Sequence, residues 1–597
     1  MRVSDNGTEC VEQRCRPGEF FDTSKLPYRC KQCSAGRFSK GGVSAECEDP
    51  PPGTYCPRPG ATESLSCQHL QGLVCYNGTA RAQEGFWLYE LNHTLGIVST
   101  AQCLPGYCAG GRLIDANQCG DHRLQTPDNV MCGRCAEGYA EQAGKCVPCT
   151  HSNTGLILLS VLLGCAVLLV IHILSQRARV AAPLSIYLYF VQISVLMIGI
   201  REAVVGWASF LNFTWFESSS GSCVLELGPF EIVQAKLVAP WMLYGPLALC
   251  CCIHYIWSNC KQQPGTLSAD GRSRDRDAVA QLLQELLVEP FQPHAWWYQS
   301  FVLVRRALIA VLDTALVLHP PNKYSSFAMC HLAFLLVHLH VHPYHDPLDN
   351  HLETASLSLI IFVASVLSVS PPPLSSALAT VMGLFVSLPI VVTPLIIARR
   401  KYRHSRAAAG ISSHDRCCGV KQLCADMCTR LRLLWTELDW RFNWRTYART
   451  VIVLLLLIYS QICTTAFRYL LCVDVGEWSV SYFHPAVSCR DHRYTAGRIA
   501  VIFLVILEAA LPVIVMYLAF RVRQLHTKRA SEPGDGDSDV DATYVPLLET
   551  VRSSLRARTL MSCLLMTIAR SLIEQSFVDN EVPNPALDAS QRREILA

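Results

Sequence analysis

The chain has 597 residues, of which 51% are hydrophobic and only 17% are charged, and its formal net charge is +3. A soluble protein carries about 25% charged residues, and a nucleic-acid-binding protein needs a concentrated basic surface. The composition therefore argues against a soluble globular protein and against a nucleic-acid partner. Charge is missing from a set of long apolar runs, so the first partner that the sequence predicts is a lipid bilayer.

Residues 1–154 are polar, with frequent Gly, Pro and Cys. They hold 15 of the 30 cysteines, and such a density in a short segment is typical of disulfides in an oxidising compartment. A weak repeat, Cys-x-x-Gly followed by an aromatic residue, occurs at Cys33–Phe38 and at Cys135–Tyr139. The glycine permits a turn, and the aromatic ring can cover the neighbouring disulfide. We predict a small, disulfide-rich, mostly β or irregular extracellular domain.

The spacing Cys132-x2-Cys135-x10-Cys146-x2-Cys149 also fits a zinc site, but disulfides are favoured beside so many other cysteines. The candidate disulfide cysteines are Cys30, Cys33, Cys47, Cys132, Cys135, Cys146, Cys149, Cys472 and Cys489. We expect the last two to pair with each other. The polar start, Met1 to Cys10, has no apolar signal region, so we expect the sequence to be a fragment or an incomplete gene product.

Nine apolar runs follow, each close to the roughly 20 residues that a helix needs to cross a bilayer. They are residues 155–175, 184–204, 237–257, 299–318, 324–342, 352–370, 374–398, 449–470 and 498–520. The predicted fold class is therefore an all-α multi-pass transmembrane bundle of about nine helices, preceded by the cysteine-rich domain.

Orientation follows from the loops. If residues 1–154 lie outside the cell or in a lumen, the inner loops hold 21 Lys and Arg residues and the outer loops hold 4, which is the positive-inside bias. Sequons for glycosylation, a modification of the outer side, begin at Asn6, Asn77, Asn92 and Asn212. All four fall on the predicted outer side, so we expect an integral protein of the plasma membrane or an endomembrane, with an outer N-terminus and a cytosolic C-terminus.

The predicted cytosolic segments are a loop at 258–298, a basic amphipathic segment at 399–448 and a tail at 521–597. Residues 531–542 are typical of a flexible acidic linker, and residues 546–577 of an amphipathic helix lying at the membrane surface. Residues 471–497 form a polar outer loop, which we expect to be a disulfide-tied cap and not a re-entrant pore.

Charged residues inside spans are costly and usually have a role. The candidates are Asp313, Glu508, Arg305 and Arg306. Structural ion pairs are one interpretation of these four, and an ion or proton path is the other. His338 and His342, four residues apart, could share a helix face and bind a metal, but hydrogen-bonded histidines are favoured.

No nucleophile elbow, phosphate-binding glycine loop or glycosidase acid pair occurs in the chain. The sequence therefore gives no indication of an enzyme, of a resident metal or of a cofactor.

Two resemblances extend this interpretation. The stretch from Cys30 to Cys47, Cys-Lys-Gln-Cys-Ser-Ala-Gly-Arg-Phe-Ser-Lys-Gly-Gly-Val-Ser-Ala-Glu-Cys, resembles the ephrin-receptor-like cysteine-rich repeat. Three membrane stretches are similar to polytopic proteins of fungi, algae and protists that are called polycystin-like or TRP-channel-like. These stretches are Trp296-Trp297 with Arg305-Arg306, the run from His342 to Glu353, and Leu471–Gly476 with Pro485–Cys489.

Two functions therefore stand side by side. The resemblance implies a channel-like protein that passes cations, with Asp313 and Glu508 near the path. The alternative is a cell-surface receptor or sensor, whose cysteine-rich domain binds an extracellular protein or glycan and shifts the helix bundle. A homo-oligomer is compatible with either function.

Overall fold

The computed structural model describes residues 14–149 with short gaps, 154–175, 181–198, 228–261, 281–369 and 444–530, and a few isolated positions near 2–11 and 377–384. The chain divides into two compact units, residues 1–292 with 296–523 and residues 293–295 with 524–597. Residues 262–280 of the predicted loop, 399–443 and 531–597, and most of the predicted span 374–398, lie outside the described residues.

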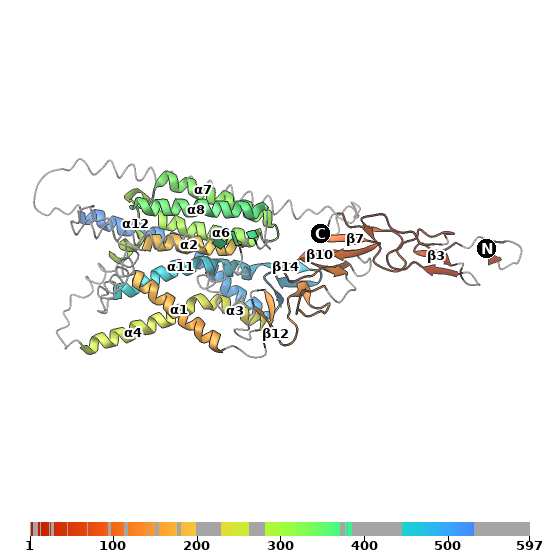
Figure 1. Cartoon of the computed structure of the whole chain (residues 1–597), viewed down its shortest axis with the longest axis horizontal. Coiled ribbons are helices and arrows are strands. Elements are labelled where there is room, and N and C mark those ends of the chain that lie inside the picture. The colour runs from red at the N-terminus through yellow and green to blue at the C-terminus, as the bar shows by residue number, and fades with distance from the viewer. Residues whose placement is uncertain are drawn as a thin grey trace, which may run out of the picture. The chain divides into compact units, whose positions relative to one another are not determined.

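The cysteine-rich region consists of small antiparallel sheets of two or three strands (Figure 1). Its elements are β1 (Arg2–Val3), β2 (Cys10–Val11), β3 (Glu19–Asp22), β4 (Arg29–Gln32), β5 (Thr54–Tyr55), β6 (Leu65–Ser66), β7 (Leu73–Tyr76), β8 (Thr79–Ala82), β9 (Phe86–Asn92), β10 (Ile97–Gln102), β11 (Gly111–Arg112), the 3-10 turn η1 (Val130–Cys132), β12 (Tyr139–Gln142) and β13 (Lys145–Pro148). Sheets this small bury little apolar surface, so cross-links contribute much of their stability.

Glycine lets successive modules of this region approach each other. Gly36, the glycine of the repeat at Cys33–Phe38, has φ +91°, the left-handed conformation that glycine adopts without strain. Gly78 has φ +71°, and a Cβ atom added to it would lie 2.1 Å from the carbonyl oxygen of Gly36. The turn predicted at the repeat is therefore present, and it also serves as a contact between modules.

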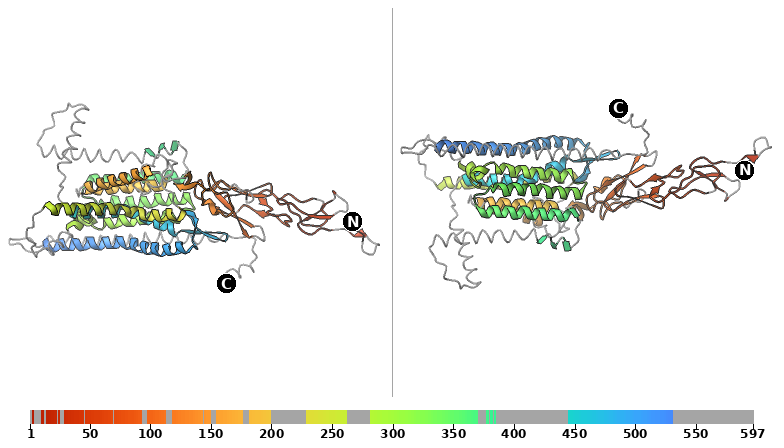
Figure 2. Two further views of the ribbon diagram at one scale, coloured as in Figure 1. Left: turned by 90° about the horizontal axis from the view of Figure 1, so that it is seen from below. Right: turned by 90° about the horizontal axis from the view of Figure 1, so that it is seen from above.

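The helical elements are α1 (Thr154–Ser175), α2 (Ala181–Ile198), α3 (Pro229–Val238), the 3-10 turn η4 (Ala239–Leu243), α4 (Tyr244–Lys261), the 3-10 turn η5 (Pro293–Ala295), α6 (Tyr298–Ala315), α7 (Pro320–Val341), α8 (Pro347–Val369), α11 (Trp444–Leu470) and α12 (His492–Ala530). Figure 2 shows these helices from two further sides. Helix α11 lies at the centre, against α1, α2, α3, α4 and α6, and α8 packs between α2 and α7.

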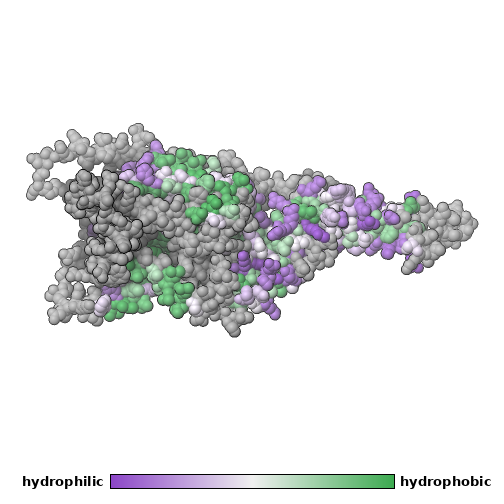
Figure 3. Space-filling model, viewed as in Figure 1, coloured by the Kyte–Doolittle hydropathy of each residue, from purple (hydrophilic) through white to green (hydrophobic). Residues whose placement is uncertain are grey.

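Five helices in the described part are long and apolar enough to cross a membrane. They are Phe230–Trp257, Pro320–Val341, Pro347–Val369, Trp444–Leu470 and His492–Gln524. Shorter apolar helices cover Val161–Ile173 and Ser185–Ile198, inside two further predicted spans. The chain is thus an integral membrane protein with several spanning helices, and the count of nine is not confirmed. Figure 3 shows hydrophobic side chains gathered on the helices and hydrophilic ones on the strands.

Helix α6 differs from the five spanning helices. It was expected as an apolar span at 299–318, yet it carries Arg305, Arg306 and Asp313, and all three side chains are buried. A charged helix of this kind is stable among apolar neighbours only if its charges find partners there. The polar contacts inside the bundle therefore centre on α6.

Three strands join α11 to α12. They are β14 (Cys472–Val475), β15 (Trp478–Ser481) and β16 (His484–Ser488), paired in that order in one antiparallel sheet, and we call them the cap sheet. Residues of the cap sheet and of the cysteine-rich region share one hydrophobic core, in which Val480 packs with Trp87 and Met131. The loop at 471–497 is therefore folded, and the cap predicted there is a sheet.

Candidate functional site

The polar core of the bundle begins with an ion pair between α6 and α8. Arg305 Nη1 donates to Glu353 Oε1 at 2.6 Å, and both side chains are 1% exposed. The ring of Tyr189 on α2 lies under the guanidinium, 4.0 Å from its carbon. Two buried charges repay their desolvation only when they are paired and well packed, and the aromatic face adds a cation–π contact. This arrangement locks α2, α6 and α8 together.

Two histidines of α7 extend this network. His338 contacts the Tyr298 hydroxyl through Nδ1 at 3.1 Å and the Asn350 carbonyl through Nε2 at 3.0 Å. His331 contacts the Phe327 carbonyl through Nδ1 at 2.7 Å and the Tyr189 hydroxyl through Nε2 at 3.0 Å. Both nitrogens of each ring are engaged in hydrogen bonds, which leaves neither ring a lone pair for a metal.

His338 and His342 do not both lie within the helix. Helix α7 ends at Val341, and His342 takes the left-handed conformation of a C-cap, with φ 45° and ψ 63°. Its side chain is exposed, whereas that of His338 is buried. The spacing of the histidines does not reveal that the helix ends between them.

A second ion cluster surrounds Asp313, whose side chain is fully buried. Its Oδ1 lies 2.6 Å from Lys323 Nζ of α7, and its Oδ2 lies 2.7 Å from Arg468 Nη2 of α11. The Arg468 guanidinium carbon in turn lies 4.9 Å from the centre of the Phe483 ring, between β15 and β16. The Asp313 carboxylate thus forms ion pairs with two cations, and the cluster connects three helices to the cap sheet.

Glu508 of α12 is in a different environment. Its side chain is 7% exposed and lies beside Cys463 of α11. Among the described residues, no Lys or Arg forms an ion pair with it, and neither carboxyl oxygen has an ion-pair or strong hydrogen-bond partner. Glu508 is therefore the one of the two predicted acids whose charge no neighbour in the described part offsets.

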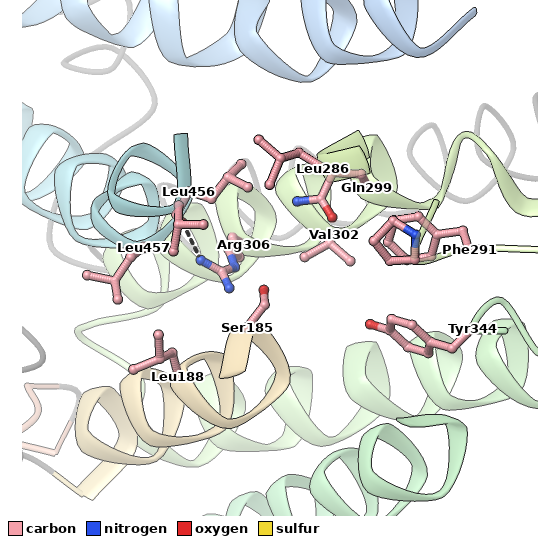
Figure 4. A pocket seen from close by; sticks show the side chains of 12 residues that line it. Ser185, Leu188, Leu286, Phe291, Gln299, Val302, Arg306, Tyr344, Leu456 and Leu457 are labelled. Atoms are coloured by element: carbon pink, nitrogen blue, oxygen red, sulfur yellow. Dashed lines mark hydrogen bonds between the residues drawn. The ribbon is translucent and has the colours of Figure 1, made fainter. Parts of the chain in front are cut away.

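Arg306 lines a cavity between α2, α6 and α11 (Figure 4). Its side chain is 3% exposed, and its Nη1 donates to the Leu456 carbonyl at 2.5 Å. No carboxylate in the described part pairs with Arg306, and its Nε has no hydrogen-bond partner. The other polar residues of the wall are Ser185, Gln299 and Tyr344, and the remaining lining residues are apolar.

The polar groups of this wall point inward. In Figure 4 the Ser185 hydroxyl is directed toward the Arg306 guanidinium, and the Tyr344 hydroxyl is directed into the space between α2 and α6. Tyr344 lies in the turn between α7 and α8, where burial raises the pKa of its hydroxyl well above the usual value. The hydroxyl therefore stays protonated and is available as a hydrogen-bond donor.

The candidate disulfide cysteines are bonded. The pairs are Cys15–Cys30, Cys33–Cys47, Cys119–Cys132, Cys135–Cys146 and Cys472–Cys489, and Cys149 is also in a disulfide. The set with zinc-like spacing therefore has no thiolates left for a metal, because zinc binds the deprotonated thiol.

Two of the four sequons lie in the described part. Asn77 is exposed at the turn between β7 and β8, and Asn92 ends β9. Asn6 and Asn212 lie outside the described residues.

The ion-pair partners of Arg305 and Asp313 were not predicted from the sequence. Glu353 and Arg468, which pair with Arg305 and Asp313, each lie inside a predicted span, so the rule that intramembrane charges have a role would have found both. No comparable signal marks Tyr189, because an aromatic residue in an apolar run is ordinary.

No protein-family model, no curated protein and no solved structure matches this chain. Its function is therefore inferred from its own residues.

Proposed function

We propose that the chain is a membrane receptor or sensor, in which the cysteine-rich region binds a protein or glycan outside the cell and moves the helix bundle. The observation that supports this most is the hydrophobic core that the cysteine-rich region shares with the cap sheet. The cap sheet also joins the end of α11 to the start of α12. A displacement of the ligand-binding region would thus act directly on two spanning helices.

Close packing supports mechanical coupling at this interface. Gly133 lies against the cap sheet, and a Cβ atom added to it would lie 2.4 Å from the backbone nitrogen of Ala486. At the base of the sheet, the rings of Tyr469 and Tyr494 stack with centroids 4.7 Å apart. Packed interfaces of this kind transmit displacements because they resist compression.

The orientation in this proposal is the one that the charge bias favours, with the cysteine-rich region outside and the C-terminus cytosolic. Disulfides and sequons in the cysteine-rich region agree with an oxidising, lumenal environment. The resemblance to ephrin-receptor-like repeats is consistent with a ligand-binding role for this region.

The coupling between the cysteine-rich region and helices α11 and α12 is tested by hydrogen exchange on the full-length protein in lipid nanodiscs. A monovalent antibody fragment against the cysteine-rich region serves as the ligand. We expect its binding to change the exchange of backbone amides in α11 and α12, and Gly133→Ala to diminish this change, because the added methyl group separates the interface. Gly133 has φ −68°, so the substitution introduces no backbone strain.

The matched control is Gly245→Ala in α4, where an added Cβ atom meets nothing within 4 Å. This variant should respond to the antibody fragment as the wild type does. Unchanged exchange in α11 and α12 with the fragment bound to the wild type would refute the proposal.

A cation channel is the second candidate, and the buried carboxyl of Glu508, which has no ion-pair partner among the described residues, favours it. Asp313 fits this role less well, because Lys323 and Arg468 offset its charge. Reconstituted protein should then carry cation currents that Glu508→Gln reduces. The absence of current in both flux and patch recordings would exclude the channel.

A further inference from the structure

We infer that the cavity beside Arg306 is a binding site for an anionic oxygen group, a carboxylate or a phosphate. This inference does not depend on the receptor role. Its basis is a difference between two neighbouring arginines of α6: Arg305 is paired with Glu353, whereas Arg306 has no acidic partner in the described part of the chain.

Arg306 has no ion-pair partner among the described residues, although its neighbour Arg305 has one. Arg305, Arg306 and Glu353 are all buried within the same group of helices, so two cations share one carboxylate. Leaving an ion unpaired in an apolar interior is costly. The Leu456 carbonyl takes up one N–H group of Arg306, but a carbonyl dipole does not neutralise a cation. A bound anion would neutralise the charge of Arg306.

Neutral hydrogen-bond donors converge on the same space. The Ser185 hydroxyl and the Tyr344 hydroxyl reach it together with the guanidinium, and Gln299 adds an amide. A guanidinium with converging neutral donors is the arrangement that binds carboxylates and phosphates, because charge-assisted hydrogen bonds are about twice as strong as neutral ones. A metal cation is disfavoured here, because Arg306 would repel it.

The cavity is small. Its volume is about 50 Å³, and a cavity needs about 10–15 Å³ of this kind of volume to hold one water molecule. It therefore has room for an anionic group of a few atoms. Apolar side chains form the rest of the wall, so an attached hydrocarbon chain would be tolerated where the cavity opens. A lipid head group and a free small anion both satisfy these requirements.

The test uses thermal unfolding of the full-length protein in nanodiscs, since a ligand that binds the folded state raises the unfolding temperature. In one arm, nanodiscs of neutral phosphatidylcholine receive inorganic phosphate or acetate, with chloride at equal ionic strength as the reference. In the other arm, the nanodiscs contain phosphatidic acid. A rise in the first arm identifies a soluble anion, and a rise only in the second identifies a lipid head group.

The variant Arg306→Gln should lose the rise in unfolding temperature, with affinity reduced about 100-fold or more, because it removes the charge that pairs with the anion. Arg306→Lys should retain part of the rise. Arg498→Gln is the control, since Arg498 is an exposed arginine of α12 and the change leaves the cavity intact.

Ser185→Ala provides a second variant if Arg306→Gln does not fold. It removes one hydroxyl donor and should weaken binding roughly tenfold, as expected for a hydrogen bond to a charged group. The inference is overturned if neither arm raises the unfolding temperature of the wild type. It is equally overturned if Ser185→Ala and Arg306→Gln respond to the anion as the wild type does.

Discussion

The hydroxyl of Tyr459 on α11 donates a hydrogen bond of 3.1 Å to the backbone carbonyl of Glu508 on α12. Pro512 lies four residues after Glu508 within α12 and has no N–H group, so this carbonyl lacks its helical partner. Tyr459 supplies the missing donor. A proline inside a spanning helix is thus tolerated because a neighbouring helix satisfies the freed carbonyl.

Tyr459→Phe should lower the free energy of unfolding by about 1–3 kcal/mol, because it leaves a buried carbonyl without a donor. In a Pro512→Ala background the same change should cost much less, since alanine has the N–H group that restores the helical hydrogen bond. Unfolding of the four proteins of this double-mutant cycle in detergent measures the coupling. Equal costs in the two backgrounds would contradict the role given to Tyr459.

Breaking the Arg305–Glu353 pair should be strongly destabilising. Arg305→Met alone, or Glu353→Leu alone, leaves a buried charge unpaired and should cost about 3–5 kcal/mol. The double variant should recover most of this loss, because two apolar side chains can replace a buried pair. Thermal unfolding in detergent measures the loss of stability in the two single variants and in the double variant. A loss in the double variant equal to the sum of the single losses would show that the two residues act independently.

Because modules of the cysteine-rich region contact each other at Gly78, this position should not tolerate a larger residue. Gly78→Ala places a Cβ atom against the Gly36 carbonyl, whereas Gly85→Ala meets nothing within 4 Å. Both glycines have positive φ, so both variants carry the backbone strain of about 1–2 kcal/mol. Only Gly78→Ala adds a steric clash, and its yield of folded protein at the cell surface should be several-fold lower than that of Gly85→Ala.

The cap sheet should lose stability in acid. Burial lowers the pKa of His484 well below its usual value, and Lys236 and Arg468 lower it further; the Lys236 ammonium lies 3.5 Å from its Nε2. In the unfolded state His484 titrates near pH 6.5. The contribution of His484 to stability is therefore complete above this pH, and it falls as the pH drops, because only the unfolded chain gains a proton.

Between pH 7.5 and pH 5 this effect should reduce stability by at most about 2 kcal/mol. His484→Gln should remove the corresponding part of the pH dependence, as measured by hydrogen exchange of the cap sheet. If the wild type and His484→Gln have the same pH profile, His484 is not the responsible group.

Several features were predictable from the sequence because they depend on local composition. Five of the nine apolar runs of about 20 residues correspond to helices of the described part that are long and apolar enough to cross a membrane. The dense cysteines identified a disulfide-rich region. The disulfide between Cys472 and Cys489 could be expected because the loop between two spans leaves these cysteines few other partners. The buried positions of Arg305, Arg306 and Asp313 followed from their places inside apolar runs.

The partners of these charges were decided by the tertiary structure alone. Arg305 and Glu353 are 48 positions apart, and Arg468 and Asp313 are 155 positions apart. Helix packing determines which distant side chains meet, and no local pattern encodes it. The sequence by itself determined that the chain has membrane-spanning helices and a disulfide-stapled region, because apolar length and cysteine density are local properties. Only the tertiary structure decided that Arg305 is neutralised while Arg306 faces a cavity, because that depends on which helix brings a carboxylate within reach.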